Sequence, residues 1–353
     1  MDPRYIRQTG LKGFGTQGQQ RLAGAKVLVV GLGGLGLPAL QYLNAMGVGT
    51  LGLMDGDRIE LNNLQRQILY GEGDLGRKKL EVAHEKLRAQ NSSTQFRLHD
   101  CYLNVDNALE IIGEYDLVLD STDNFSTRYL INDACVILGK AFIYGALHGF
   151  EGHVSVFNHK QGPTYRCLYP KMPSDSEVPN CNANGVLGVI PGIIGNLQAL
   201  EAVKLLTGLG EVLSGKLLLF DGLTQSYVKI GLKVNPKNLQ IKELQKSYQV
   251  AGCESILSIS ADDFQLELAE NPNLFLLDVR NPEEFEVSHL KEAINVPMSH
   301  LVLPQKPLPQ KIYVICQSGK RSETSAIQLQ RLYPDSQFLT ILGGMDKMQN
   351  LCP

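Results

Sequence analysis

The stretch Val29-Val30-Gly31-Leu32-Gly33-Gly34-Leu35-Gly36 ends an apolar, strand-like run and opens a run with a helical pattern. Gly31, Gly33 and Gly36 give the spacing G-x-G-x-x-G. Because glycine has no Cβ, such a loop can turn tightly and bring its backbone N–H groups close to a phosphate. The helix that follows points its positive dipole end at the same place. We therefore expect Gly33 and Gly34 to contact the phosphates of a nucleotide.

The residues around this loop complete a strand-helix-strand unit. Residues 25–30 form the first expected strand, apolar residues one turn apart over 37–43 predict the helix, and residues 50–54 form the second strand. Asp55 follows that strand, where a carboxylate can accept a hydrogen bond from a ribose hydroxyl. This order predicts an α/β domain that binds a dinucleotide or ATP, and it leaves the choice between them open.

The bulk properties are those of an ordinary globular protein with two domains. The chain has 353 residues, of which 43% are hydrophobic and 20% charged. A formal net charge of −3 gives no reason to expect nucleic acid or an anionic membrane as a partner. The N-terminus has no apolar signal segment, and polar residues interrupt the most apolar run, 185–203. We expect a cytoplasmic protein without a membrane span.

Polar side chains at the ends of later elements have the chemistry of a triphosphate site. Asn63, Arg66 and Lys79 lie downstream of Asp55, and the basic pair could neutralise phosphates, although lysines on a helix surface are usually only solvated. Asp123 follows the expected strand 117–119 at an edge where open α/β sheets bind ligands, so it could hold Mg²⁺ or a ribose. The alternative for Asp123 is a simple helix N-cap.

An irregular segment and a second domain follow. Residues 158–184 have no regular pattern, which is typical of a binding loop or lid, and this loop contains Cys181. A helix is expected after Pro191, and a strand over 217–220 is expected to complete the first domain. The seven cysteines include no C-x-x-C pair, so a cysteine that matters should act as a thiol.

The domain boundaries follow from changes in polarity. We expect a first domain over residues 1–234, a polar linker over 235–256 and a small second domain over 257–353. In the second domain the strand 312–315 leads into a glycine-containing loop and then a helix. The loop consists of Cys316, Gln317, Ser318, Gly319, Lys320 and Arg321.

This loop has the composition of a sulfur-carrying site. Its N–H groups and the positive end of the next helix can converge on the sulfur of Cys316, and Lys320 and Arg321 can lower the pKa of the thiol and stabilise a persulfide. A cysteine phosphatase is the rival, but its cradle separates cysteine and arginine by five residues, where this chain has four. A buried structural cysteine is the remaining alternative.

Four ordered motifs of the first domain closely resemble those of the ubiquitin-activating-like adenylyltransferases, and within them the molybdopterin-synthase and thiamine sulfur-carrier activating enzymes. The motifs are Arg4-Tyr-Ile-Arg7-Gln8, Gly31-x-Gly-Gly-x-Gly36, Asn63-Leu-Gln-Arg66-Gln67 and Asp120-Ser-Thr-Asp123-Asn124. The second domain, with Leu277-Asp278-Val279-Arg280, His289 and the Cys316 loop, resembles a rhodanese. The resemblance implies a Rossmann-like ATP-binding domain with a mixed sheet, joined to a small α/β rhodanese-like domain.

The resemblance implies an activity and its partners. Such enzymes use ATP and Mg²⁺ to adenylate the C-terminal Gly-Gly of a ubiquitin-like sulfur carrier protein, and sulfur then displaces AMP to leave a thiocarboxylate. The sulfur comes from thiosulfate or a cysteine desulfurase, and the product serves pathways such as molybdopterin or thiamine synthesis.

The resemblance also implies roles for individual residues. Asp55 would hold the ribose, Asn63, Arg66 and Lys79 the phosphates, and Asp123 the Mg²⁺. Arg7 would reach the triphosphate of the other protomer in a homodimer. Cys181 falls where the family carries a cysteine proposed to form an acyl or disulfide link, and Cys316 would carry the persulfide.

The chain departs from the family in one respect. Many members hold a structural zinc with two C-x-x-C pairs. Here Thr164 replaces the first cysteine of the pair that ends at Cys167, and Asn235-Pro236-Lys237-Asn238 stands where the second pair would lie. Too few thiolates remain, so we predict that no structural zinc is bound.

Other functions stay open at this stage. The glycine loop and Asp55 would also suit a nicotinamide-dependent dehydrogenase, although such an enzyme needs neither a triphosphate site nor a thiol loop. A scaffold that only docks partners would leave the Cys316 loop without a purpose. A third alternative is the activation of a ubiquitin-like protein for conjugation to an amine.

Overall fold

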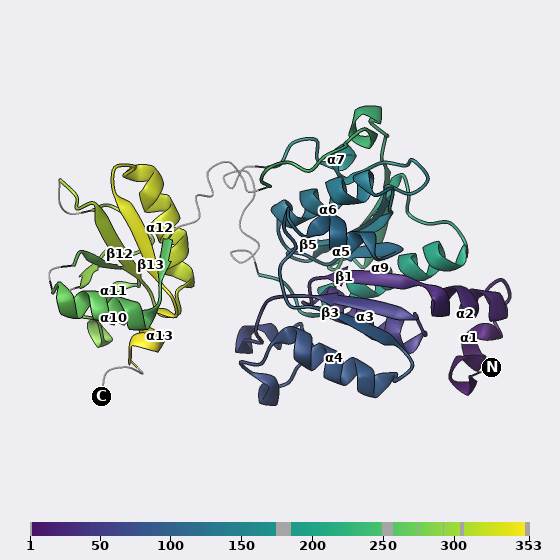
Figure 1. The fold of residues 1–353 in the computed structure, drawn as a ribbon, viewed down its shortest axis with the longest axis horizontal. Helices are drawn as coiled ribbons and strands as arrows, with labels where there is room; N and C mark the ends of the chain where they lie inside the picture. The colour runs from purple at the N-terminus through teal and green to yellow at the C-terminus, as the bar shows by residue number, and fades with distance from the viewer. Residues whose placement is uncertain are drawn as a thin grey trace. The chain divides into compact units, whose positions relative to one another are not determined.

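The computed structural model describes residues 2–173, 185–248, 257–272, 274–291, 293–303 and 307–349. The chain divides into two compact units, Met1–Val250 and Ala251–Pro353 (Figure 1). Cys181 lies outside the described residues. Each unit is described below by itself.

The first unit is built on one mixed sheet of eight strands in the order β3-β2-β1-β4-β5-β6-β7-β8. The strands β1 to β5 run parallel to their neighbours, whereas β6, β7 and β8 pair antiparallel. The strand bounds are β1 Lys26–Val30, β2 Thr50–Met54, β3 Gln95–His99, β4 Leu117–Asp120, β5 Phe142–His148, β6 Glu151–Phe157, β7 Lys216–Asp221 and β8 Ser226–Gly231. This arrangement confirms the predicted Rossmann-like domain with a mixed sheet.

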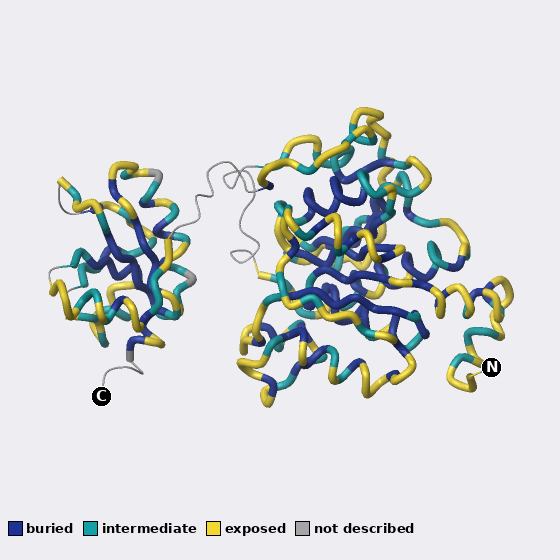
Figure 2. The backbone as a smooth tube through the Cα atoms, in the orientation of Figure 1, coloured by how far each residue is buried: buried dark blue, intermediate teal, exposed yellow. Residues whose placement is uncertain are grey.

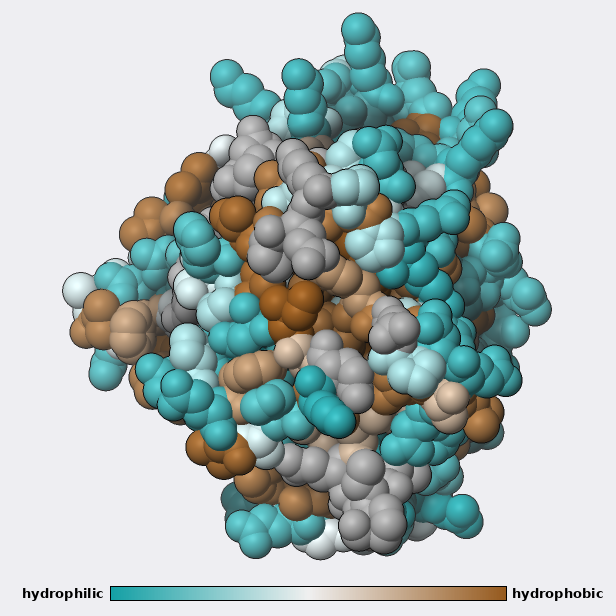
Figure 3. All heavy atoms as spheres, turned by 90° about the vertical axis from the view of Figure 1, so that its left-hand side faces the viewer, coloured by the Kyte–Doolittle hydropathy of each residue, from teal (hydrophilic) through white to brown (hydrophobic). Residues whose placement is uncertain are grey.

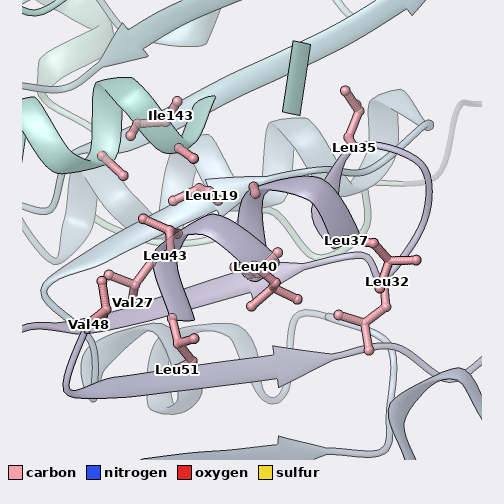
Figure 4. Packing of buried hydrophobic residues seen from close by; sticks show 14 of the residues in the cluster. Val27, Leu32, Leu35, Leu37, Leu40, Leu43, Val48, Leu51, Leu119 and Ile143 are labelled. Atoms are coloured by element: carbon pink, nitrogen blue, oxygen red, sulfur yellow. The ribbon is translucent and has the colours of Figure 1, made fainter. Parts of the chain in front are cut away.

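Helices cover both faces of this sheet, so its central strands are apolar throughout. In β1, Val27 and Val29 pack into one hydrophobic cluster with α3 and α9, whereas Leu28 and Val30 pack into a second cluster with α5 and α6. The first cluster is seen around α3 in Figure 4, and the central strands are buried along their length in Figure 2.

The helices of the first unit connect these strands. Their bounds are η1 Pro3–Tyr5, α1 Ile6–Thr9, α2 Gly15–Gly24, α3 Gly36–Ala45, η2 Leu61–Asn63, η3 Glu72–Asp74, α4 Lys79–Gln90, α5 Ala108–Gly113, α6 Phe125–Ile137, α7 Tyr165–Leu168, α9 Val189–Thr207 and η4 Pro236–Leu239. By length and composition alone α9 could cross a membrane, but half of its most apolar window is buried in this fold. It packs against α3, β5 and β6, as a core helix does.

Two features of the first unit differ from the sequence prediction. The strand β7 was expected to complete the domain, but β8 follows it and forms the edge of the sheet. The predicted linker 235–256 is also wrong in its first half, because residues 235–248 pack on the first unit. Tyr248 is 5% exposed and its hydroxyl donates to Asp133 Oδ2 at 2.7 Å. Polar segments without periodicity can thus be fixed by a single buried aromatic.

The second unit has a smaller sheet of five parallel strands in the order β11-β10-β12-β13-β9. The strands are β9 Leu257–Ile259, β10 Leu276–Asp278, β11 Ala293–Asn295, β12 Lys311–Ile315 and β13 Gln337–Ile341. The helices are α10 Ala261–Glu270, α11 Pro282–Val287, α12 Lys320–Leu332 and α13 Gly344–Gln349. Two buried clusters flank this sheet, one containing Cys316 and the other Phe264 and Tyr313. The predicted strand-loop-helix around Cys316 is therefore present.

Hydrophobic and hydrophilic side chains are both exposed on the surface of the protein. On the face shown in Figure 3, hydrophobic residues are exposed near the centre and at several places along the rim, with hydrophilic residues between them. The second unit has a cavity of about 910 Å³ lined by residues including Glu267, Phe275, Pro309 and Lys311. Lys311 begins β12 and Cys316 directly follows its end, so this cavity lies away from the predicted sulfur site.

Candidate nucleotide and sulfur sites

The register of three strands brings the predicted nucleotide residues to one edge of the sheet. Val30 of β1 pairs with Met54 of β2 on one side and with Asp120 of β4 on the other. The residues that follow, Gly31, Asp55 and Ser121, therefore leave neighbouring strands at the same level, about 4.8 Å apart from one strand to the next. The strand order reverses at β1, between the parallel neighbours β2 and β4, and open α/β sheets bind ligands at such a point.

The glycine loop is packed so closely that two of its glycines cannot carry a side chain. Gly31 has φ +97°, and a Cβ there would lie 2.8 Å from the Ser121 carbonyl oxygen. A Cβ on Gly36 would lie 2.0 Å from the Gly31 carbonyl oxygen. Gly33 is different, because the nearest atom to its Cβ position is Gln67 Nε2 at 3.8 Å. The loop is thus fixed by Gly31 and Gly36 and leaves room at Gly33 for a ligand.

Asp55 connects the glycine loop to the end of β2. Its Oδ2 accepts from the Leu32 N–H and its Oδ1 from the Asp57 N–H, both at 2.7 Å. Burial raises the pKa of this carboxyl, and the nearby Lys79 ammonium and the two N–H donors act in the opposite direction. Each carboxylate oxygen can accept more than one hydrogen bond, so Asp55 can still accept from a ribose hydroxyl.

Lys79 reaches the same edge from the start of α4. Its side chain is 7% exposed, and its Nζ donates to Asp57 Oδ2 at 2.7 Å. The other oxygen of Asp57 accepts from the Tyr102 hydroxyl at 2.6 Å. Sequence reasoning singled out Lys79 but missed Asp57 and Tyr102. The position of Asp57, two residues after Asp55 at a strand end, was the available signal.

Asn63 and Arg66 lie on the connection between β2 and α4. Asn63 is buried, and its Oδ1 accepts from the Glu60 N–H at 3.2 Å. An Arg66 guanidinium nitrogen donates to the Asn62 carbonyl at 2.9 Å. The Cβ position of Gly34 lies 3.4 Å from Arg66 Cγ, so the structure brings Arg66 against the glycine loop.

The end of β4 carries one buried and one exposed carboxylate. Asp120 is fully buried, its Oδ1 accepts from the Thr122 N–H and hydroxyl, and its Oδ2 has no partner among the described residues. Asp123 is exposed, and the N-cap of α6 is its neighbour Asn124, whose side chain accepts from the Thr127 N–H at 2.9 Å. The N-cap alternative for Asp123 is therefore wrong, and its carboxylate is open to a ligand.

A buried arginine that the sequence did not single out supports this strand end. Arg128 is 6% exposed and donates to the Thr122 carbonyl at 2.8 Å. Its guanidinium lies 5.6 Å from the centre of the Phe125 ring and 5.5 Å from that of Tyr144. Arg128 thus fixes the turn that carries Asp123.

Arg7 is the predicted site residue that does not join this group. It is exposed on α1, next to Gln8, whose Nε2 donates to the Met46 carbonyl at 2.9 Å. Met46 lies at the far end of α3 from the glycine loop. Since α3 has ten residues, this end is about 15 Å from the loop, and Arg7 does not reach the nucleotide edge of its own chain.

The residues at the expected zinc position meet around a single sulfur. Cys167 Sγ accepts from the Asn235 N–H at 3.3 Å and the Thr164 N–H at 3.4 Å, with the Thr164 hydroxyl and the Asn238 amide both at 3.5 Å. Burial raises the pKa of this thiol, but the four hydrogen bonds outweigh it and the net effect is a lowered pKa. The residues that stand in place of the zinc-binding cysteines thus still lie close together, and they donate hydrogen bonds to one sulfur.

The second unit holds Cys316 at the base of a backbone cradle. The thiol is fully buried, and its Sγ accepts from the Gly319 N–H at 3.2 Å. The next residues begin α12 with Lys320, and Ser318 is exposed. The Cys316 carbonyl accepts from the Met345 N–H at 2.9 Å, which ties the loop to α13. The N–H of Gly319, which precedes α12, thus binds the sulfur, and the convergence of further loop N–H groups on it stays a prediction.

The side chain of Gln317 holds the loop in place through two hydrogen bonds. Its Oε1 accepts from Arg280 at 2.9 Å, and its Nε2 donates to Asp346 Oδ1 at 2.6 Å. Arg280 is 1% exposed and pairs with the buried Asp278 at 2.7 Å. A buried ion pair thus holds one end of Gln317, and the Asp278-Val279-Arg280 motif was the local signal for this arrangement.

Arg321, which was predicted to lower the pKa of the Cys316 thiol, forms an ion pair in the structure. Its two terminal nitrogens donate to the two carboxylate oxygens of Glu284, at 2.6 and 2.7 Å. Glu284 was not singled out in the sequence. Because its charge is already compensated, Arg321 contributes less positive potential to the sulfur than the sequence suggested.

The chain belongs to the ThiF family, whose pattern matches residues 5–241, and a rhodanese-like domain matches residues 260–351. A curated relative is the adenylyltransferase and sulfurtransferase MOCS3 of Drosophila persimilis, which is 41% identical over 372 residues covering 97% of this chain and 82% of that protein. MOCS3 of Culex quinquefasciatus is 37% identical over 375 residues covering 97% and 86%. These matches confirm the predicted family.

Solved structures with the same fold include Escherichia coli MccB, determined with MccA-N7isoASN and with ATP. For the first, the TM-score is 0.61 at 23% identity, covering 69% of this chain and 74% of that chain. For the second, the TM-score is 0.61 at 22% identity with the same coverage. At these identities the likeness establishes a shared fold.

Proposed function

We propose that this protein adenylates the C-terminal glycine of a ubiquitin-like sulfur carrier protein and then transfers sulfur to it. The observation that carries the proposal is the joint presence of a nucleotide edge around Gly33 and a thiol cradle around Cys316 in one chain of this family. In the first reaction the carboxylate attacks the α-phosphate of ATP and pyrophosphate leaves. The product is an acyl adenylate, whose AMP is a good leaving group.

The roles at the nucleotide edge follow from the positions of the side chains. Gly33 and Gly34 offer backbone N–H groups to the phosphates, and Lys79 and Arg66 approach from the connection between β2 and α4. Asp55 accepts from the ribose. The exposed Asp123 carboxylate is the ligand for Mg²⁺, which would neutralise charge on the phosphates.

In the second reaction a persulfide on Cys316 supplies the sulfur. A donor of the thiosulfate type transfers its outer sulfur to the thiolate and releases sulfite; a cysteine desulfurase would transfer the same sulfur from its own persulfide. The terminal persulfide sulfur then attacks the acyl adenylate and AMP leaves. A second thiol must break the resulting S–S bond to free the thiocarboxylate, and Cys181 is the candidate by resemblance.

We propose that the active form is a homodimer in the cytoplasm. Arg7 is next to Gln8, which contacts the far end of α3 from the glycine loop of its own chain, and this position supports a role in the site of a second copy. The outward side of α9, including Val189 at 59% and Leu200 at 51% exposure, offers apolar surface for such a contact.

Mixing Arg7→Ala and Asp123→Ala subunits should restore some activity, because one site of the hybrid has both residues. Two inactive parents that remain inactive after verified subunit exchange would refute this arrangement.

The proposal that no structural zinc is bound rests on the donors around Cys167. Zinc requires thiolate, imidazole or carboxylate ligands, whereas Thr164, Asn235 and Asn238 present N–H and hydroxyl groups to the one sulfur. Native mass spectrometry of protein purified with added zinc tests this point. A bound equivalent that survives dialysis and is lost in Cys167→Ser would contradict it.

The decisive experiment combines two readouts. Candidate carriers ending in Gly-Gly are incubated with the protein, MgATP and thiosulfate, and mass spectrometry should detect the exchange of one oxygen for sulfur. Exchange of labelled pyrophosphate into ATP should require the carrier and be abolished in Asp123→Ala. Binding of NADH in preference to ATP would instead favour a dehydrogenase, and transfer of the carrier to an amine would favour conjugation.

A further inference from the structure

The two arginines beside the Cys316 loop are each paired with a carboxylate. Arg280 binds Asp278 and Arg321 binds Glu284. Arg280 is buried and bound to Asp278, so its charge is compensated within the fold. Arg321 is the described cation of this loop that remains partly exposed, at 36% of its side chain.

Glu284 holds the charge of Arg321 in a fixed geometry. The bidentate contact is the strongest arrangement that a guanidinium and a carboxylate can form. Glu284 is itself immobilised, because its Oε2 also accepts from the Asn281 N–H at the start of α11. The Arg321 guanidinium lowers the pKa of Glu284 to about 2, so this carboxylate stays ionised at neutral pH.

Arg321 is also close enough to the sulfur site to interact with it. It is the second residue of α12, two positions after Gly319, whose N–H binds Cys316 Sγ. The hydrogen-bonded Glu284 carboxylate raises the pKa of Arg321 most strongly, whereas burial acts in the opposite direction. A dianion that approaches Cys316 therefore meets an arginine already neutralised by a carboxylate 2.6 Å away.

We propose that Glu284 sets the donor specificity of the sulfur site, by compensating Arg321 and so weakening the binding of small dianionic sulfur donors such as thiosulfate. The inference rests on the proposed sulfur transfer at Cys316. Glu284 is a specificity-determining residue that acts through Arg321, and it takes no part in bond breaking. The transfer itself is balanced: the thiolate attacks the outer sulfur, the S–S bond of thiosulfate breaks, and sulfite leaves with the electron pair.

The first test is the thiosulfate:cyanide reaction of the full-length protein. Glu284→Gln keeps the shape of the side chain and one acceptor oxygen for the Asn281 N–H and one Arg321 nitrogen, while it removes the charge. It should lower the KM for thiosulfate by about 3- to 10-fold with little change in kcat, and added salt should reduce the difference. Glu286→Gln is the matched control, because it removes one charge from an exposed position on the same helix. It should leave KM unchanged.

A double variant separates this proposal from a structural effect. In Glu284→Gln/Arg321→Gln the gain in thiosulfate binding should vanish, because the cation that Glu284 compensates is gone. An unchanged KM in Glu284→Gln, or a gain that persists without Arg321, would overturn the proposal. A fall in kcat together with a fall in the unfolding temperature would assign Glu284 a structural role instead.

A second measurement does not depend on turnover. Cys316 is alkylated with neutral iodoacetamide and with anionic iodoacetate, and peptide mass spectrometry gives both rates. Glu284→Gln should raise the ratio of the iodoacetate rate to the iodoacetamide rate, while Glu286→Gln should not. If the wild type transfers no sulfur, the proposed sulfurtransferase fails, and this ratio still decides the role of Glu284. An unchanged ratio would refute it.

Discussion

At the residue scale, the nucleotide edge depends on two glycines for different reasons. Gly36 is fixed by contact, since its Cβ position lies 2.0 Å from a backbone oxygen that cannot move without the loop. Gly33 is open on its Cβ side. A third glycine, Gly113 on α5, has nothing within 4 Å and provides a reference. These three positions distinguish a packing requirement from a binding requirement.

We expect Gly36→Ala to destabilise the first unit by about 1–3 kcal/mol and to weaken ATP binding, because the loop must shift to admit the methyl group. Gly33→Ala should keep the stability of the wild type but lose ATP affinity, if phosphates pass over this residue. Gly113→Ala should change neither. Urea unfolding and calorimetric titration with ATP measure both quantities. Full ATP affinity in Gly36→Ala would show that the loop is more tolerant than its packing indicates.

Cys316 allows a second prediction at this scale. Cys316→Ala should abolish sulfur transfer from thiosulfate to cyanide, because no thiolate remains to accept the outer sulfur. Carrier-dependent pyrophosphate exchange should continue in the same protein, since the nucleotide edge belongs to the other unit. Cys101→Ala is the control thiol, because Cys101 lies in the first unit and is half-buried. Release of phosphate from an aryl phosphate by the wild type would favour the phosphatase alternative.

At the scale of elements, the ion pair between Glu284 and Arg321 joins α11 to α12. The folded pKa of Glu284 is about 2, below its usual 4.5, so the folded state favours the ionised carboxylate. This contribution to stability is complete above about pH 4.5 and is lost as the pH falls from 4.5 towards 2. Protonation of the carboxylate should therefore destabilise α11 while the five-stranded sheet is still folded.

The measurement is amide hydrogen exchange of the full-length protein, followed over α11 and α12. Between pH 7 and about 5, Glu284→Gln should exchange faster than the wild type, after correction for the intrinsic pH dependence of exchange. The difference should shrink as the pH falls towards 2. Glu286→Gln should follow the wild type throughout. A difference that is constant over this range would show that the pair does not control the stability of α11.

The elements that the sequence predicted well are those with local signals. The first strand-helix-strand unit was recognised because the glycine spacing, the apolar period and Asp55 occur within 31 consecutive residues, 25–55. The strand β8 was missed because all six of its residues are exposed, so no alternation of apolar and polar residues marks it. The strand is stabilised by backbone pairing with β7, which the sequence pattern does not reveal.

The site residues that the sequence predicted are likewise those with a local sequence signal. Lys79, Arg66 and Asp55 were found because their motifs are local, and the structure brings them to one edge. Asp57 and Glu284 were missed because their roles depend on partners 22 and 37 residues away in the sequence. Such pairings between distant elements have no local signature.

At the scale of the whole molecule, the boundary of the first unit can be tested by truncation. A fragment ending at residue 248 keeps Tyr248 and the hydrogen bonds of Asn235 and Asn238 to Cys167, whereas one ending at 234 loses them. We expect the shorter fragment to be less stable by about 2–4 kcal/mol, from the lost burial of an aromatic side chain and its hydrogen bonds. Thermal unfolding of both fragments gives the comparison.

The variant Tyr248→Phe in the longer fragment provides the control for burial. It keeps the ring and removes the hydroxyl that binds Asp133, so it should cost about 1 kcal/mol. Equal stability of the two fragments would show that residues 235–248 behave as a linker, as the sequence predicted. Because Arg166 also binds Asp133, a large effect of Tyr248→Phe would indicate a cooperative network of these three side chains.

The convergence of donors on Cys167 has a consequence for how the protein matures in the cell. The groups that close this junction come from the chain itself and are present as soon as residue 238 has been synthesised. A junction closed by a metal would instead wait for an ion and for the proteins that deliver it. On the proposal that no zinc binds here, we expect the first domain to assemble at the same rate in zinc-starved and zinc-replete cells, so its supply of activated carrier would not follow the zinc content of the growth medium.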